Sequence, residues 1–277
     1  MTADLQSFAE LVATDEFDLA HACLCVAQDE YPDLAPEASL ARLDAMAATI
    51  RSRLAVDAFA EQRMAALNHH LYAELGFRGN ADAYYDPRNS YLNEVLERRL
   101  GIPITLSIVY MEVGRRIGLA LRGVSFPGHF LVLARLRRGD LVLDPFAGGV
   151  PRSAADLRAT LAQALPAGVA AEADLAPFLE PVPARDILAR MLRNLKAAYL
   201  GAGDTERALR VLNRMLVVVP GAAEELRDRG MLYADMGAFR AAVEDLQSYL
   251  HRRPAAPDAE PVRARLVELT AARARLN

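Results

Sequence analysis

The fold is decided by the stretch from Tyr91 to Gly149, which reads YLNEVLERRLGIPITLSIVYMEVGRRIGLALRGVSFPGHFLVLARLRRGDLVLDPFAGG. Its central part predicts one buried helix from about Pro103 to Ile117, because apolar residues recur there at helical spacing. Proline at the first helical position and Gly118 just past the end are typical start and stop signals. The apolar face consists of Leu106, Val109, Tyr110, Val113 and Ile117.

Two short apolar runs follow this helix and predict an antiparallel hairpin. They are Phe130 to Leu133 and Leu141 to Leu143, separated by the polar segment Arg137-Arg138-Gly139-Asp140. His129 precedes the first strand and Asp144 follows the second. Closing the hairpin would therefore bring an imidazole and a carboxylate towards each other.

The order of helix, strand with His and strand ending in Asp resembles the transglutaminase-like core of cysteine acyl-transfer enzymes. In that family a Cys on the first turn of the helix is the nucleophile, the His takes its proton and the Asp orients the imidazole. Such a thiolate is stabilised by the helix N-terminus and by the imidazolium. Here the family's Gly-x-Cys falls on Gly101-Ile102-Pro103. The resemblance thus implies a degenerate site in which Pro103 occupies the position of the nucleophile.

Longer motifs narrow the resemblance to the bacterial SirB-type family, a transglutaminase-like domain joined to tetratricopeptide repeats. The family is associated by name with regulation of invasion genes, and the missing Cys is its normal state. The motifs are AQDEYP (Ala27 to Pro32), LGFRGN (Leu75 to Asn80), YYDPRNSYLNEVLERRLGIPITLS (Tyr84 to Ser107), FPGHFLV (Phe126 to Val132) and LDPFAGG (Leu143 to Gly149).

Composition indicates a soluble globular protein and restricts its partners. The chain has 277 residues, 53% of them hydrophobic and 25% charged, with a formal net charge of -4. The chain has no excess of Lys and Arg over Asp and Glu, so we expect no nucleic-acid partner. No segment is apolar enough for a membrane span and no secretory signal begins the chain, so we expect a cytoplasmic protein without membrane contact. The pattern indicates no particular oligomeric state.

Cysteines and histidines give no sign of a metal or cofactor. Cys23 and Cys25 share one helical segment and are predicted to be reduced and half-buried. One alternative is that either thiol folds back to supply the missing nucleophile, although their spacing does not favour this. His69 and His70 have no further ligand at metal-site spacing, so neither a metal nor a cofactor is expected.

The segment from 77 to 92 is rich in turn formers and tyrosines, and it predicts a loop beside His129. Either its tyrosines pin the loop to the core, or the loop lines a pocket. The candidate pocket residues are Tyr85, Asn89, Tyr91 and Asn93.

The end of the chain repeats with a period of 34 residues, which predicts two tetratricopeptide-like helix pairs and a shielding helix from about Pro261 to Leu276. Small and large residues alternate as packed helix pairs require. The predicted packing residues are Tyr199, Ala208, Leu212 and their partners Tyr233, Ala242, Leu246.

These features predict an α+β chain in two parts. Residues 1–180 form a SirB-type domain, mostly helical at first, that leads into a transglutaminase-like (papain-like) core at 84–150 with a small antiparallel sheet. Residues 181–277 form the all-α repeats with their capping helix.

Three functions stay open. The first is a non-catalytic regulatory or adaptor protein that binds a protein or peptide partner through the repeats. The second is a hydrolase or acyltransferase in which Thr105 or Ser107 replaces the Cys, with His129 and Asp144. The third is a structural partner with a vestigial pocket. Without a nucleophile, the His–Asp pair is interpreted first as a brace for the hairpin.

Overall fold

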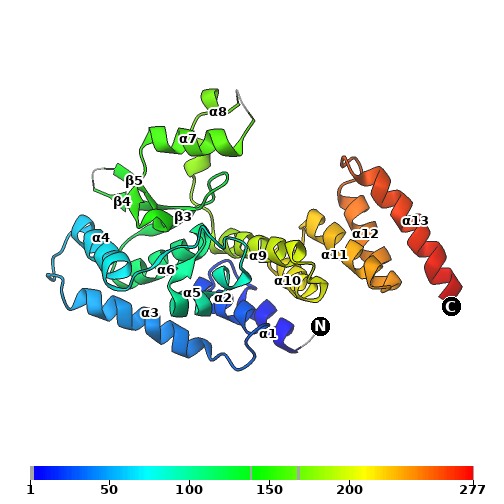
Figure 1. Ribbon diagram of the computed structural model, residues 1–277, viewed down its shortest axis with the longest axis horizontal. Coiled ribbons are helices and arrows are strands. Elements are labelled where there is room, and N and C mark those ends of the chain that lie inside the picture. Colours follow the sequence, from blue (N-terminus) through cyan, green and yellow to red (C-terminus); the bar gives the residue numbers. More distant parts are fainter. Residues whose placement is uncertain (1–2, 138, 167–168, 277) are drawn as a thin grey trace. The chain divides into compact units, whose positions relative to one another are not determined.

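The computed structural model describes residues 3–137, 139–166 and 169–276. Contacts between Cα atoms divide the chain into two compact units, Met1–Asn194 and Leu195–Asn277. The division falls within a single helix, α9 (Ala184–Gly201). The predicted α+β class is confirmed: helices precede and follow a small antiparallel sheet, and the C-terminal part is helical (Figure 1).

The first unit begins with a run of helices that ends at α6, and α2 to α5 pack against α6. In chain order they are α1 (Ala3–Leu11), α2 (Leu19–Ala27), α3 (Pro36–Arg51), α4 (Ala60–Asn68), the π-helix η1 (His69–Glu74), the 3₁₀-helix η2 (Pro87–Asn89), α5 (Leu92–Arg98) and α6 (Pro103–Arg116). Both cysteines lie on α2, where Cys23 is fully buried and Cys25 is partly exposed.

Helix α6 is the central element of this unit, as its periodicity predicts. Pro103 to Gly114 are all buried, and Gly118 adopts a φ of +80° just past the end, a conformation that glycine favours.

A two-stranded parallel ladder lies at the start of α6. It is formed by β1 (Arg78–Gly79) and β2 (Leu100–Gly101), with Gly79 paired to Gly101.

A four-stranded antiparallel sheet follows α6 in the order β3-β4-β5-β6. The strands are β3 (Leu121–Val124), β4 (Leu131–Leu136), β5 (Gly139–Asp144) and β6 (Val150–Pro151). The predicted hairpin is β4–β5, in which Val132 pairs with Leu143 and Leu136 with Gly139. Neither β3 nor β6 was predicted from the sequence, and nor was the β1–β2 ladder, whose first strand lies in the segment predicted to be a loop. Arg138, in the predicted turn, lies outside the described residues.

The sheet is covered on its two faces by helices of the same unit. Helix α6 packs on β3 and β4, and α7 (Ala154–Ala164) packs on the opposite face through Leu157 and Leu161 (Figure 1). The remaining elements before α9 are the 3₁₀-helix η3 (Pro145–Ala147), α8 (Val169–Glu172) and the 3₁₀-helix η4 (Ala176–Leu179).

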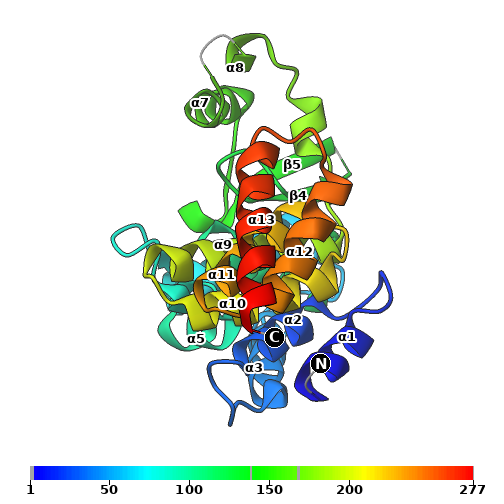
Figure 2. The same ribbon diagram turned by 90° about the vertical axis from the view of Figure 1, so that its right-hand side faces the viewer.

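The second unit consists of stacked antiparallel helices. After the end of α9 come α10 (Thr205–Val218), α11 (Ala223–Asp235), α12 (Phe239–Arg252) and α13 (Ala259–Leu276). Each of α10 to α13 packs against the next, and Figure 2 shows α13 beside α12. The apolar core of α11 to α13 includes Leu226, Leu246 and Val262.

Candidate functional site

The start of α6 is closed by a side chain rather than presented to a substrate. Pro103 is buried at the first helical position after Ile102, the N-cap. The hydroxyl of Thr105 accepts a hydrogen bond from the Ile102 N–H at 3.1 Å and donates one to the carbonyl of Asn89 at 2.7 Å. Thr105, at N3, therefore makes the half of a capping box in which the N3 side chain accepts from the N-cap N–H, and the apolar Ile102 side chain cannot make the other half.

The structure brings His129 and Asp144 together. The imidazole Nε2 lies 2.9 Å from Asp144 Oδ1, which also accepts from the backbone N–H groups of Phe146 at 3.1 Å and Ala147 at 3.2 Å. A carboxylate at Nε2 selects the tautomer that carries its proton there, so the lone pair lies on Nδ1. Among the described residues Nδ1 has no hydrogen-bond partner, and the His129 side chain is 19% exposed.

A series of contacts connects this dyad to the beginning of α6. The rings of His129 and Phe146 meet edge to face, with centroids 6.0 Å apart at 86°. A Cβ on Gly79 would lie 2.4 Å from the Phe146 ring, so glycine permits this close approach. Gly79 pairs across the ladder with Gly101, two residues before Pro103. Contacts therefore run from the imidazole through Phe146 and Gly79 to β2, the strand that precedes α6.

Ser107 lies one turn further along α6 and does not join the dyad. It is fully buried, and its Oγ has no hydrogen-bond partner within the described part of the chain. The hydroxyl of Tyr110, on the same face of the helix, is buried and unpaired in the same way. Burial raises the pKa of Tyr110, so its hydroxyl stays protonated.

Tyr72 is a site residue that the sequence analysis missed. It lies in the π-helix η1, stacks on Tyr110 with centroids 6.4 Å apart, and donates a hydrogen bond from its hydroxyl to the carbonyl of Pro145 at 3.0 Å. Burial raises its pKa, and Tyr110 and Asp144 raise it further. Tyr72 reaches the dyad from the π-helix η1, which also contains His69 and His70. Sequence periodicity does not reveal a π-helix.

The four predicted pocket residues lie in different surroundings. Tyr85 is 74% exposed, and its ring meets that of Tyr84 edge to face with centroids 5.3 Å apart. Tyr91 is the buried N-cap residue of α5 and packs edge to face on Tyr31. Asn93 has a buried carbonyl oxygen without a partner among the described residues, and Asn89 is completely buried.

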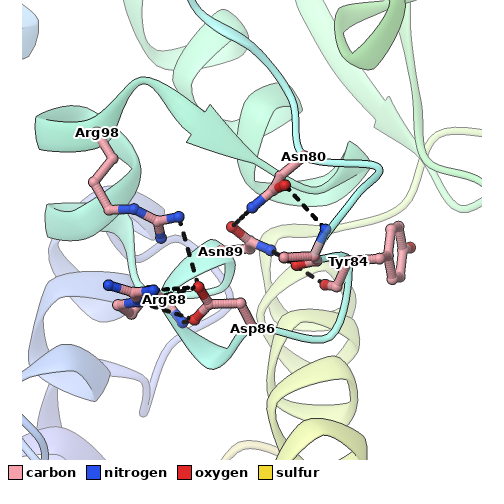
Figure 3. A network of polar contacts seen from close by, with 7 residues as sticks. Asn80, Tyr84, Asp86, Arg88, Asn89 and Arg98 are labelled. Carbon is pink, nitrogen blue, oxygen red and sulfur yellow. Dashed lines mark hydrogen bonds and ion pairs between the residues drawn. The ribbon is translucent and has the colours of Figure 1, made fainter.

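The loop from Asn80 to Asn89 is braced from within (Figure 3). Asn80 donates to the Asn89 side chain at 3.0 Å, and Asn89 donates to the carbonyl of Ala83 at 2.7 Å. Asp86 accepts from the Arg88 guanidinium at 2.8 Å and lies 3.6 Å from that of Arg98. Asn89 thus holds the loop together and also receives the Thr105 hydroxyl, which are structural tasks.

A groove of about 990 Å³ lies elsewhere in the first unit, away from the dyad. Its walls come from the segment between α1 and α2, from α6, from the edge strand β3 and from the start of α9 with the residues before it, and they include Asp18, Glu112, Arg122 and Ile187. Glu112 is already paired with Arg115 and Arg116. None of the predicted site residues lines this groove.

The two repeats of the second unit have corresponding turns. Gly203 and Gly237 adopt φ values of +72° and +75°, and the residue after each donates a 2.9 Å backbone hydrogen bond, Asp204 to Tyr199 and Ala238 to Tyr233. Of the predicted packing residues only Tyr233 is partly exposed. The buried ones are Tyr199, Ala208, Leu212, Ala242 and Leu246.

The described residues contain neither a metal-binding cluster nor a helix suited to a membrane. No group of three or more His, Cys, Asp or Glu side chains among them could hold a metal ion. In the same part of the chain, no helix combines the length and apolar character that crossing a bilayer requires.

Comparison with known proteins gives matches along most of the chain. The family model described as Transglutaminase-like superfamily matches residues 37–193, and a Tetratricopeptide repeat model matches residues 195–267. A UPF0162 protein of Xylella fastidiosa is 43% identical over 259 residues, 94% of this chain and 92% of that protein. A UPF0162 protein of Vibrio cholerae is 33% identical over 210 residues, 75% and 76% of the two chains. F-box only protein 21 of Mus musculus is 46% identical over 71 residues, 26% of this chain and 11% of that protein.

Proposed function

We propose a non-catalytic adaptor role for this chain, which belongs to the transglutaminase-like superfamily and, with the UPF0162 proteins, to the SirB-type family that adds tetratricopeptide repeats. In this role the first unit is a folded platform without turnover. The repeat unit binds a protein or peptide partner in the cytoplasm, and the chain regulates that partner through this binding.

The observation that carries the proposal is the use of the Thr105 hydroxyl. A nucleophile needs a base within hydrogen-bond reach, about 2.6–3.2 Å. Thr105 instead donates to the Asn89 carbonyl and caps α6. Ser107 is buried inside the unit, where its hydroxyl has no hydrogen-bond partner among the residues that the structure describes, and the Pro103 side chain has no heteroatom to ionise. These contacts support a dyad that is retained without a nucleophile.

The repeat unit supports the binding half of the proposal. Its core is filled, yet Leu200 and Met236 are 40% and 58% exposed, beside the equivalent turns at Gly203 and Gly237. Repeats of this kind offer extended surfaces to peptides and helices of other proteins. Apolar side chains at such positions are available for a partner to cover.

Affinity capture with the full-length chain tests the binding half. A tagged chain expressed in a bacterium that naturally carries the protein should capture a reproducible partner, identified by mass spectrometry. The double variant Leu200→Glu, Met236→Glu should lose that partner at unchanged stability, because exposed positions tolerate substitution. Val267→Glu, at a position 71% exposed on α13, is the matched control. Capture that is indifferent to both variants would argue against the repeats as the binding element.

Turnover assays test the catalytic half. The full-length chain and its His129→Ala variant should hydrolyse or transfer acyl groups from ester, thioester and glutamine-amide substrates at equal, background rates. Turnover that disappears in His129→Ala and in Thr105→Val or Ser107→Ala would instead establish the hydroxyl-dependent hydrolase or acyltransferase.

A further inference from the structure

Arg190, on α9, makes an unusual set of contacts with the turn that carries His129. Its Nη1 donates to Ser125 Oγ at 2.6 Å and to the Phe126 carbonyl at 3.1 Å, and its Nη2 donates to the His129 carbonyl at 2.7 Å. The guanidinium carbon also lies 5.5 Å from the centre of the Phe130 ring. One side chain therefore contacts the turn from its first residue to its last.

The turn itself has little internal support. The His129 N–H donates to the Phe126 carbonyl at 3.1 Å, and Gly128 adopts a φ of +69°. The imidazole projects from the last residue of this turn, so rotation of the turn would swing it away from Asp144. The three bonds from Arg190 oppose that rotation because they hold both ends.

These contacts are made at an electrostatic cost. Among the described residues no carboxylate lies within ion-pair distance of Arg190, so carbonyl and hydroxyl oxygens and the face of the Phe130 ring compensate its charge. Burial lowers the pKa of this guanidinium. A half-buried cation without a counter-charge is unfavourable unless its donors are satisfied, as they are here by the turn.

The same helix is independently held against the sheet. Ile187 lies one turn before Arg190, and a Cβ on Gly123 would lie 2.8 Å from its Cδ1. Glycine in β3 thus lets α9 approach closely, at a position that brings Arg190 to the turn. The contact of α9 with the sheet at Ile187 therefore does not depend on the guanidinium of Arg190.

We infer that Arg190 is the positioning residue of the His129–Asp144 dyad, holding the backbone of His129 while Asp144 holds its Nε2. This goes beyond the proposed function, since it concerns how the dyad is maintained whether or not any substrate is turned over. It also makes α9 part of the site.

Nitrogen NMR of the full-length chain labelled with ¹⁵N-histidine tests the inference. At about pH 8.5, above the ordinary histidine pKa of about 6.5, neutral imidazoles show their tautomers directly. His129 signals are assigned by their absence in His129→Gln. The wild type should show a single tautomer with the proton on Nε2. Arg190→Ala should instead show a mixture of the two His129 tautomers. Arg190→Met retains the alkyl packing on Phe130; it should show the same mixture, and it is the test variant if Arg190→Ala does not fold.

Arg185→Ala is the matched control. Arg185 anchors the same helix by donating to the carbonyls of Val12 at 2.8 Å and Thr14 at 3.1 Å, and these partners lie outside the His129 turn. This variant should leave the His129 signals unchanged. A wild-type tautomer in folded Arg190→Met, or the same mixture in Arg185→Ala, would overturn the positioning role and leave Arg190 as a structural brace.

Discussion

The hydroxyl of Thr105 donates to the carbonyl of Asn89 at 2.7 Å, although sixteen residues separate the two in the chain. The same hydroxyl accepts from the Ile102 N–H, so one side chain both caps α6 and ties the loop of Figure 3 to it. A buried hydroxyl engaged in this way serves the fold. Like Pro103, the hydrogen-bonded Thr105 hydroxyl distinguishes the start of α6 from the start of the corresponding helix in an acyl-transfer enzyme.

Thr105→Val should therefore lower the free energy of unfolding by about 2–4 kcal/mol, because two buried partners each lose a hydrogen bond worth about 1–3 kcal/mol. Thr105→Ser keeps the hydroxyl and should cost about 1 kcal/mol or less. Urea denaturation of both variants measures the difference. Equal losses would show that the hydroxyl does not stabilise the start of α6.

The two members of the dyad should differ in their effect on stability. Asp144 is buried and also caps η3 by accepting from two N–H groups, so Asp144→Ala should cost about 2–4 kcal/mol. His129→Ala should cost about 1 kcal/mol or less, since its ring is partly exposed. Thermal unfolding followed by calorimetry compares them. A larger loss in His129→Ala would mean that the imidazole is the main brace of the hairpin.

Pro103→Cys should create a reactive thiol. The positive end of α6 and an imidazolium both lower a thiol pKa from about 8.5, whereas burial raises it, and position 103 is buried. The matched comparison is therefore the buried Cys23, whose pKa burial raises, and alkylation of the new thiol at neutral pH should be roughly tenfold faster than at Cys23. Mass spectrometry of iodoacetamide labelling follows each site. His129→Ala should slow the new thiol, and indifference to that change would show that Pro103 does not mark the nucleophile position.

Two helical glycines in the C-terminal helices offer a matched pair. A Cβ on Gly230 would lie 2.9 Å from Leu246 Cδ2, so Gly230→Ala must displace the packing of α11 on α12 and should cost about 1–3 kcal/mol. Gly201, at the end of α9, has nothing within 4 Å of such a Cβ, and Gly201→Ala should add up to about 1 kcal/mol through helix propensity. Denaturant midpoints of the two variants should move in opposite directions.

Acid should weaken the Asn80–Asn89 loop through Asp86. Burial alone would raise the pKa of this carboxyl, but hydrogen bonds from Arg88 and the charge of Arg98 hold it below its ordinary value. Its stabilisation is therefore complete above the unfolded pKa of about 3.9 and is lost as pH falls further through the folded pKa. Hydrogen exchange of the loop between about pH 3 and pH 6 should show this. In Asp86→Asn the exchange, corrected for its intrinsic pH dependence, should be flat.

Much of the fold was predictable because local chemistry encodes it. Pro103 and Gly118 bracket α6 as the sequence indicates, and the hairpin pairs β4 with β5. The 34-residue period reappears in the turns at Gly203 and Gly237. Strand β3 was missed because Leu-Arg-Gly-Val is short and contains glycine, which weakens any strand signal.

The candidate site was predictable only in part. Its reactive residue types follow from the sequence, but Tyr72, Phe146 and Arg190 carry no local signal of their roles. Asn89 and Tyr91 were grouped as pocket residues because they share one loop. The structure instead buries Asn89 within the loop and turns Tyr91 towards Tyr31.

The sequence by itself determined α6 and where it begins, the β4–β5 hairpin, that no thiol stands at the start of α6 and that the chain ends in repeats, since these depend on local patterns. Only the tertiary structure decided what each polar side chain does. Thr105 meets a carbonyl sixteen residues away, and Arg190 meets one 61 residues away. Burial obliges such donors and acceptors to pair, but which of them pair is set by how the elements pack. Periodicity reports which face of a helix is buried, and packing alone brings distant partners within hydrogen-bond reach.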